Sequence, residues 1–199
     1  MDQRWAISNL CELAVEGRRC RHRAASKYED SGENPRNAGS VLRPDAFAER
    51  LRAVSLDDLS ARGFRGIIVD LDNTLLGYGK ERLAAEDAAW IAAARDRGFG
   101  VCLVSNNFNG RVTRVGTELG VPSVPSALKP LPRGFLAALR LLGTTRAQTV
   151  VVGDQLFTDV LGAKLLGLHA VLTEPLVGND WLGTRVLRFL ERALLGRRR

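Results

Sequence analysis

The stretch Gly66–Leu76 reads GIIVDLDNTLL, an apolar run that ends in two carboxylates only one residue apart. Its β-branched residues favour a buried β-strand, and Asp70 and Asp72 stand where that strand ends. Two carboxylates this close repel each other, and burial of the strand removes the water that would otherwise stabilise their charges. We therefore expect a cation beside the pair, which would let both carboxylates coexist and take different roles.

Apolar runs of the same kind recur along the chain and alternate with helical stretches. Further strands are predicted over residues 100–105, 149–153 and 169–172, with a weaker one over 121–124. Helices are predicted over residues 83–97, 109–119, 132–142 and 159–166. A glycine follows each helix, where left-handed backbone closes a helix end. Apolar strands separated by helices predict an α/β fold with a doubly wound, Rossmann-like parallel sheet covered on both faces.

The length of 199 residues suits one domain with a sizeable core. Residues 1–40 show weak periodicity and a polar, turn-rich run, so they are predicted to form a poorly ordered N-terminal extension to a folded domain over 41–199. No apolar run approaches the roughly 20 residues that cross a bilayer. The first residues lack the apolar segment of a secretory signal, and the three cysteines form no disulfide framework. These features favour a cytoplasmic location.

Polar side chains follow each of the predicted strands. The first strand is followed by Asp70 and Asp72, the second by Ser105, Asn106 and Asn107, and the third by Asp154. Lys129 lies between the second and third groups, and Asp159 at the start of the helix after the third. In a doubly wound sheet the carboxyl ends of the strands meet at one edge, where ligands bind. We therefore expect all of these side chains at one site.

This set of groups suits phosphoryl transfer. Carboxylates with backbone oxygens are ligands that Mg²⁺ prefers, and a hydroxyl, an amide and a lysine suit a phosphate. Asp70 could attack phosphorus as a carboxylate nucleophile, and Asp72 could protonate the leaving oxygen and then activate water. Ser105, Asn106 and Lys129 are the candidate substrate-binding residues.

The same residues resemble the motifs of the haloacid dehalogenase (HAD) superfamily in their usual order. DLDNT resembles the first motif, Ser105 the second, Lys129 the third, and GDQLFTD (153–159) the acidic fourth. The resemblance implies that Asp70 is the nucleophile and a Mg²⁺ ligand, and that Asp72 is the acid/base whose backbone carbonyl also binds the metal. It implies that Asp154 completes the protein ligands, that Ser105 and Lys129 hold the phosphate, and that Asp159 supports them.

A closer resemblance is to the YqeG-like branch, subclass IIIA, which includes mitochondrial phosphatidylglycerophosphate phosphatases. It is carried by DLDNTL, SNN, KP and GDQLFTDVLG, within residues 42–195. It implies phosphatidylglycerophosphate as substrate, although a phosphate on protein, on a nucleic-acid end or on a small ester remains open. The intervals from Asp70 to Ser105 and from Ser105 to Lys129 are too short for a cap domain. An uncapped site would accept a bulky substrate.

Other interpretations of these motifs are weaker. A calcium loop starting at Asp70 would need glycine where the chain has Leu75. Asp159 could serve only as a helix cap, and Ser105 only as a turn residue. The two histidines, His22 and His169, lie in the N-terminal extension and in a predicted strand, so neither a zinc site nor a histidine base is expected.

Residues 181–199 are predicted to form a basic amphipathic helix, because apolar and arginine stripes recur there at helical spacing. This segment contains six arginines and one glutamate, and the whole chain has a net charge of +7. Such a helix could lie on an anionic membrane or pack on its own domain or in a dimer, and the oligomeric state stays open. A second class of function is a non-catalytic module that binds RNA or a protein through these arginines.

Overall fold

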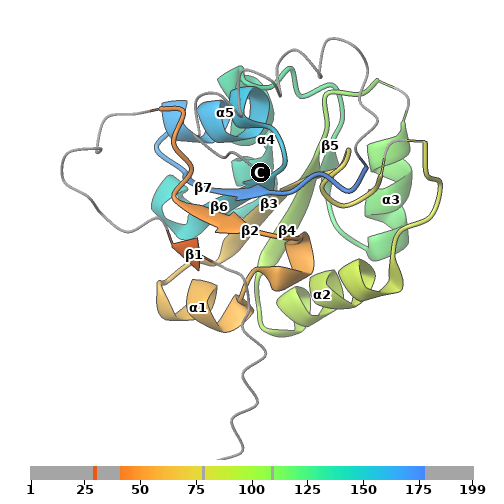
Figure 1. The fold of residues 1–199 in the computed structure, drawn as a ribbon, viewed down its shortest axis with the longest axis horizontal. Coiled ribbons are helices and arrows are strands. Elements are labelled where there is room, and N and C mark those ends of the chain that lie inside the picture. The colour runs from red at the N-terminus through yellow and green to blue at the C-terminus, as the bar shows by residue number, and fades with distance from the viewer. Residues whose placement is uncertain (1–28, 31–40, 78, 109, 178–199) are drawn as a thin grey trace, which may run out of the picture.

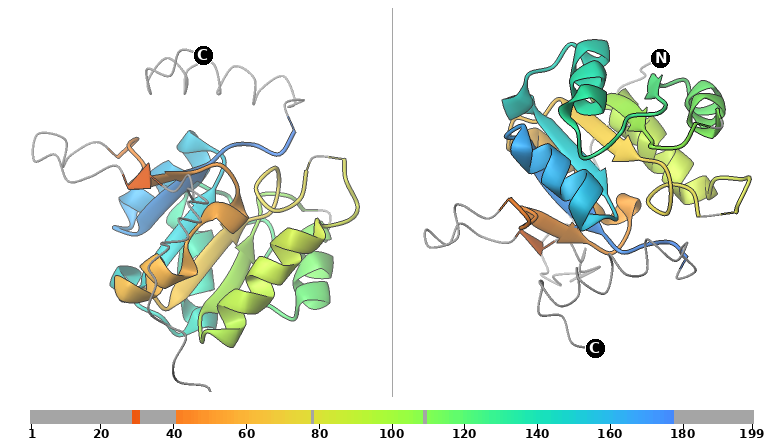
Figure 2. Two further views of the ribbon diagram at one scale, coloured as in Figure 1. Left: turned by 60° about the horizontal axis from the view of Figure 1, so that its bottom comes forward. Right: turned by 90° about the horizontal axis from the view of Figure 1, so that it is seen from above.

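The computed structural model describes residues 29–30, 41–77, 79–108 and 110–177. In these ranges the chain forms one seven-stranded sheet with helices on both faces (Figures 1 and 2). The strands are β1 (Glu29–Asp30), β2 (Ala46–Ala48), β3 (Gly66–Asp70), β4 (Gly100–Val104), β5 (Ser123–Val124), β6 (Thr149–Gly153) and β7 (His169–Thr173). The helices are α1 (Leu56–Ala61), α2 (Ala85–Asp96), α3 (Arg111–Leu119), α4 (Pro132–Leu142) and α5 (Leu161–Leu165), with short turns η2 (Leu51–Ala53), η3 (Arg146–Gln148) and the π-type η4 (Leu156–Val160). None of the helices in these ranges is both long and apolar enough to span a membrane.

The strands lie in the order β1-β2-β7-β6-β3-β4-β5. From β2 to β5 each neighbouring pair is parallel, and β1 pairs antiparallel with β2 at the edge. The chain runs outward from β3 through β4 to β5 and then returns to the other side of β3 to form β6. This confirms the predicted doubly wound fold. It also places the reversal of strand order between β3 and β6, where such folds bind their ligands.

Two hydrophobic cores cover the two faces of the sheet. Along β3 the side chains alternate, since Ile67 and Val69 belong to one core and Ile68 to the other. Trp90 of α2 packs in the first core, and Phe135 of α4 packs in the second. Both faces of the central strand are therefore buried, which explains why its sequence is apolar throughout.

The structure differs from the sequence-based expectation at the ends of some elements. The helix predicted from Asp159 begins earlier, because η4 starts at Leu156 and continues into α5. β1 lies inside the segment predicted as a poorly ordered extension, so the sheet includes two residues from before position 41. The rest of residues 1–40 and the predicted C-terminal helix from Trp181 onward lie outside the described residues.

Candidate active site

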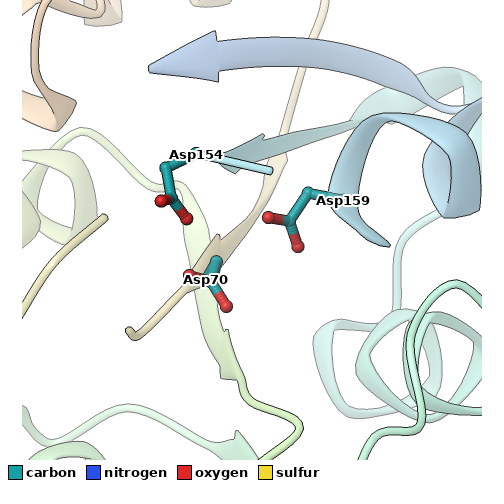
Figure 3. A group of neighbouring side chains, drawn as sticks. All are labelled: Asp70, Asp154 and Asp159. Atoms are coloured by element: carbon teal, nitrogen blue, oxygen red, sulfur yellow. The ribbon is translucent and has the colours of Figure 1, made fainter. Parts of the chain in front are cut away.

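Three buried carboxylates meet at the carboxyl edge of β3 and β6. Asp70 is the last residue of β3, Asp154 directly follows β6, and Asp159 lies in η4. Figure 3 shows the three side chains pointing toward one another from these elements. One carboxylate oxygen of each lies within 4.8 Å of the others. The parallel pairing of β3 with β6 thus brings together residues that are more than eighty positions apart in sequence.

Gly153 lets Asp159 come close to the end of β6. A Cβ atom at this position would clash with Cγ of Asp159, which no side chain could tolerate without a shift. Asp159 is also fixed by the backbone, because its Oδ2 accepts a hydrogen bond from the N–H of Gln155 at 3.2 Å. The small residue at the strand end therefore positions the carboxylate.

Replacing Gly153 with Ala should push Asp159 away from this position. We expect the free energy of unfolding to fall by about 1–3 kcal/mol, the usual result of forcing an extra carbon into a packed site, and any activity that depends on the position of Asp159 to fall with it. Gly100→Ala in β4 is the control, because the nearest atom to its new carbon is the flexible end of Leu142. Urea denaturation of both variants makes the comparison. Equal stability of Gly153→Ala and wild type would contradict this account of the strand end.

Lys129 compensates the acidic group from a third segment, the loop between β5 and α4. Its Nζ donates hydrogen bonds to Oδ1 of Asp70 and, at 2.6 Å, to Oδ1 of Asp159. Burial disfavours the charged ammonium, but Asp159 and Asp70 outweigh it and raise the pKa of Lys129. The lysine is therefore a buried cation held by two carboxylates.

The second carboxylate oxygen of Asp70, Oδ2, differs from Oδ1 because Lys129 does not bind it. Burial raises the pKa of Asp70 well above its usual range, Lys129 opposes this, and the nearby Asp159 and Asp154 add to it. Oδ2 of Asp70 is buried and has no hydrogen-bond partner among the described residues. Since buried polar atoms are normally satisfied, this oxygen marks a position for another group. A hard divalent cation with oxygen ligands fits the three carboxylates present.

Asp72 is compensated separately from Asp70. Its Oδ2 accepts hydrogen bonds from Oγ of Ser105 at 2.7 Å and from Nδ2 of Asn107 at 2.8 Å. Its Oδ1 accepts one from Nη1 of Arg111 at 2.9 Å. Lys129 and Arg111 thus each offset part of the charge of one carboxylate of the pair, and the expected cation beside the pair stays a prediction. The sequence analysis placed Asn107 at the predicted edge without a role and missed Arg111, which begins α3.

The loop after β3 is hydrogen-bonded to the residue that follows β6. Oγ1 of Thr74 donates to Oδ1 of Asp154 at 3.3 Å, which links the loop to the end of β6. Leu75 and Leu76 are buried in the core, and the loop follows a strand rather than the helix that precedes an EF-hand calcium loop.

Two of the predicted residues have more than one contact. Ser105 also accepts a hydrogen bond from the N–H of Asn107 at 3.0 Å, so it shapes the turn as well as binding Asp72. Asn106 binds the backbone of Lys129 through both ends of its amide, at 2.7 and 3.0 Å. The structure therefore places all seven predicted site residues at this edge, and His169 at the start of β7 lies apart from them.

Comparison with known proteins decides the family. A family model described as haloacid dehalogenase-like hydrolase matches residues 45–167, a range that contains the whole site. The chain belongs to this family. It is 36% identical over 152 residues to "Probable phosphatase YqeG" of Bacillus subtilis (strain 168), which is 76% of this chain and 88% of the relative. The haloacid dehalogenase-like chain is therefore a phosphatase.

More distant relatives were also found. The chain is 28% identical over 167 residues to "Phosphatidylglycerophosphate phosphatase 1, chloroplastic/mitochondrial" of Arabidopsis thaliana, covering 77% of this chain and 47% of the relative. Thus the chain matches about half the length of that protein. A cobalt-bound deoxy-D-mannose-octulosonate 8-phosphate phosphatase (YrbI) from Haemophilus influenzae aligns with a TM-score of 0.47 and 15% identity, over 66% of this chain and 89% of that one.

Proposed function

We propose that this phosphatase hydrolyses phosphomonoesters through a phosphorylated Asp70 and depends on Mg²⁺. The observation that supports this most strongly is the carboxylate of Asp70, in which Oδ1 is bound by Lys129 while Oδ2 is buried without a partner among the described residues. A carboxylate oriented in this way by a fixed cation is suited to attack phosphorus.

The first chemical step uses Asp70 and Asp72. A carboxylate oxygen of Asp70 attacks phosphorus, and the bond between phosphorus and the ester oxygen breaks. Asp72 in its acid form gives its proton to the leaving oxygen, so the alcohol leaves neutral.

The second step restores the site. Asp72, now a carboxylate, takes a proton from a water molecule whose oxygen attacks phosphorus, and inorganic phosphate leaves Asp70. Ser105, Asn106 and Lys129 hold the phosphate, because their donors converge on the same edge as the two carboxylates.

Asp70, Asp154 and the backbone carbonyl of Asp72 would hold Mg²⁺, with Asp159 as support. When bound, Mg²⁺ neutralises negative charge on the phosphate oxygens.

We further propose that the substrate is a phospholipid monoester, phosphatidylglycerophosphate, met at the inner face of a membrane by a cytoplasmic enzyme. The name of the Arabidopsis relative supports the lipid. The short connections support a bulky substrate, because only α2 and β4 occupy the interval from Asp70 to Ser105, and only α3 and β5 the interval from Ser105 to Lys129, within the part of the chain that the structure describes. The predicted basic C-terminal helix is a proposed additional contact with anionic lipid.

The test is phosphate release from vesicles that contain phosphatidylglycerophosphate, with Mg²⁺ or with EDTA. We expect release only with Mg²⁺. Cleavage of a soluble aryl phosphate without release from vesicles would discard the lipid substrate and leave the chemistry standing. Equal release in EDTA would instead remove the metal from the proposal.

A further inference from the structure

Three exposed apolar side chains border the active site. Phe108 is 77% exposed, Leu131 is 57% exposed and Leu128 is 45% exposed. Leu128 and Leu131 flank Lys129 on the loop before α4, and Phe108 follows Asn107 on the loop after β4. We call Phe108, Leu128 and Leu131 the apolar rim.

Hydrogen bonds join the two loops that carry the apolar rim. The amide of Asn106 pairs with the backbone N–H and C=O of Lys129 at 2.7 and 3.0 Å. The N–H of Ser126 donates to the carbonyl of Asn107 at 3.3 Å. The rim therefore stands on one connected surface at the carboxyl edge of the sheet, next to the phosphate-binding donors.

The backbone of Leu128 adopts an uncommon conformation. Its φ of 55° lies in the left-handed region, which is unfavourable for a residue with a Cβ atom. Packing does not explain this choice, because the Leu128 side chain is nearly half exposed. Unfavourable backbone conformations of this kind cluster at catalytic and ligand-binding sites.

The surroundings of the apolar rim are basic. Arg133 in the first turn of α4 and Arg114 in α3 are exposed. Of the four basic residues in 105–133, Lys129 and Arg111 pair with aspartates of the site, so Arg114 and Arg133 supply the exposed positive charge, beside one acidic residue, Glu118. An anionic surface would therefore be attracted to the face that carries the rim.

We propose that the apolar rim docks this phosphatase on an anionic phospholipid bilayer, with Phe108, Leu128 and Leu131 inserted among the lipids. This inference rests on the proposed function, since a phosphate group at the bilayer surface would then meet Lys129 and Asp70 without leaving the membrane. A bilayer needs no matching shape and offers both apolar chains and anionic phosphates.

The test compares two multiple variants of the full chain. The rim variant combines Phe108→Ser, Leu128→Asn and Leu131→Ser. Asn tolerates left-handed backbone, and residue 131 is the N-cap of α4, where Ser is favoured. The control variant combines Leu141→Ser and Leu165→Ser, which are 56% and 57% exposed and lie in the last turns of α4 and α5. The last turn of α4 lies at the opposite edge of the sheet, because the adjacent Leu142 approaches Gly100 at the start of β4.

Co-sedimentation with phosphatidylcholine vesicles that contain phosphatidylglycerol is the first measurement. We expect the rim variant to bind at least about tenfold more weakly than wild type, because its apolar groups no longer leave water, and the control variant to bind like wild type. The ratio of turnover on phosphatidylglycerophosphate vesicles to turnover on a soluble aryl phosphate should fall by a similar factor. Unchanged vesicle binding of the rim variant, or an equal loss in the control variant, would overturn the proposal.

Two further outcomes separate the explanations. In the first, light scattering shows that the rim variant no longer self-associates, while its vesicle binding equals that of wild type. The rim would then contact a second copy of the chain, and the proposal would be wrong. Failure of every substrate would count against the proposed function alone, since vesicle binding would still decide the role of the rim.

Discussion

Asp70→Asn should reduce phosphate release by at least about 10⁴-fold, the scale seen when a catalytic nucleophile is removed. The substitution preserves the shape of the side chain and its Oδ1 acceptor for Lys129, but the amide is not a nucleophile toward phosphorus. The fold should survive. Because burial raises the pKa of Asp70 in the folded protein, the ionised form destabilises the native state at neutral pH, and a neutral side chain removes that penalty.

A matched control comes from a second buried aspartate. Asp87 of α2 is 2% exposed and burial raises its pKa as well, but its ion-pair partner is Arg52, at 3.6 Å, rather than Lys129 or Arg111. Asp87→Asn should keep turnover close to that of wild type. Steady-state phosphate release and far-UV circular dichroism on both variants decide the matter. Substantial turnover by folded Asp70→Asn would reject the aspartyl-phosphate mechanism, while a loss in both variants would show that buried aspartates act here through stability.

The central part of the fold follows from short sequence patterns. GIIVD, GVCLV and TVVVG became β3, β4 and β6 because each run is apolar on both sides of its strand, and a parallel sheet between two helical layers buries both sides. Once these strands are parallel, the groups after them share an edge. The convergence of Asp70, Ser105 and Asp154 could therefore be predicted without knowledge of any distance.

The missed elements have weaker local signals. β2 is only three residues long and α1 only six, so neither shows a periodicity that can be read from sequence. β2 forms because it pairs with β7, more than one hundred residues later in the chain. A strand whose stability depends on so distant a partner cannot be recognised from its own residues.

The pairing of acidic with basic side chains at the site could not be predicted from the sequence either. Lys129 was expected to meet the phosphate, and the structure shows it between Asp70 and Asp159. Arg111 reaches Asp72 only because α3 begins directly beside the loop after β3. Which base pairs with which acid depends on side-chain reach across loops, and spacing along the chain does not encode it. A consequence is that Lys129 and Arg111 offset only part of the charge of the four aspartates, and the remaining negative charge suits a divalent cation.

Lys129→Met should therefore destabilise the protein by about 3–5 kcal/mol, the usual effect of removing one partner of a buried ion pair. Methionine has a similar length and fills the space with an apolar chain, but it leaves Asp70 and Asp159 buried together without the ammonium that both now contact. A divalent cation that binds the native state should restore part of this loss, because ligands that bind only the folded protein shift unfolding toward higher denaturant. Urea denaturation with EDTA and with Mg²⁺ measures both effects.

Lys164→Met provides the comparison that isolates burial. Lys164 pairs with Asp45 at 2.7 Å, but the two side chains are 27% and 28% exposed, so solvent screens the pair and its loss should cost at most about 1 kcal/mol. Mg²⁺ should not affect the stability of this variant differently from wild type. If Lys129→Met unfolded at the same urea concentration as Lys164→Met, the ammonium would not be compensating the acidic group. If Mg²⁺ stabilised neither variant, Asp70, Asp154 and Asp159 would not form the cation site, and the unpartnered oxygen of Asp70 would need another explanation.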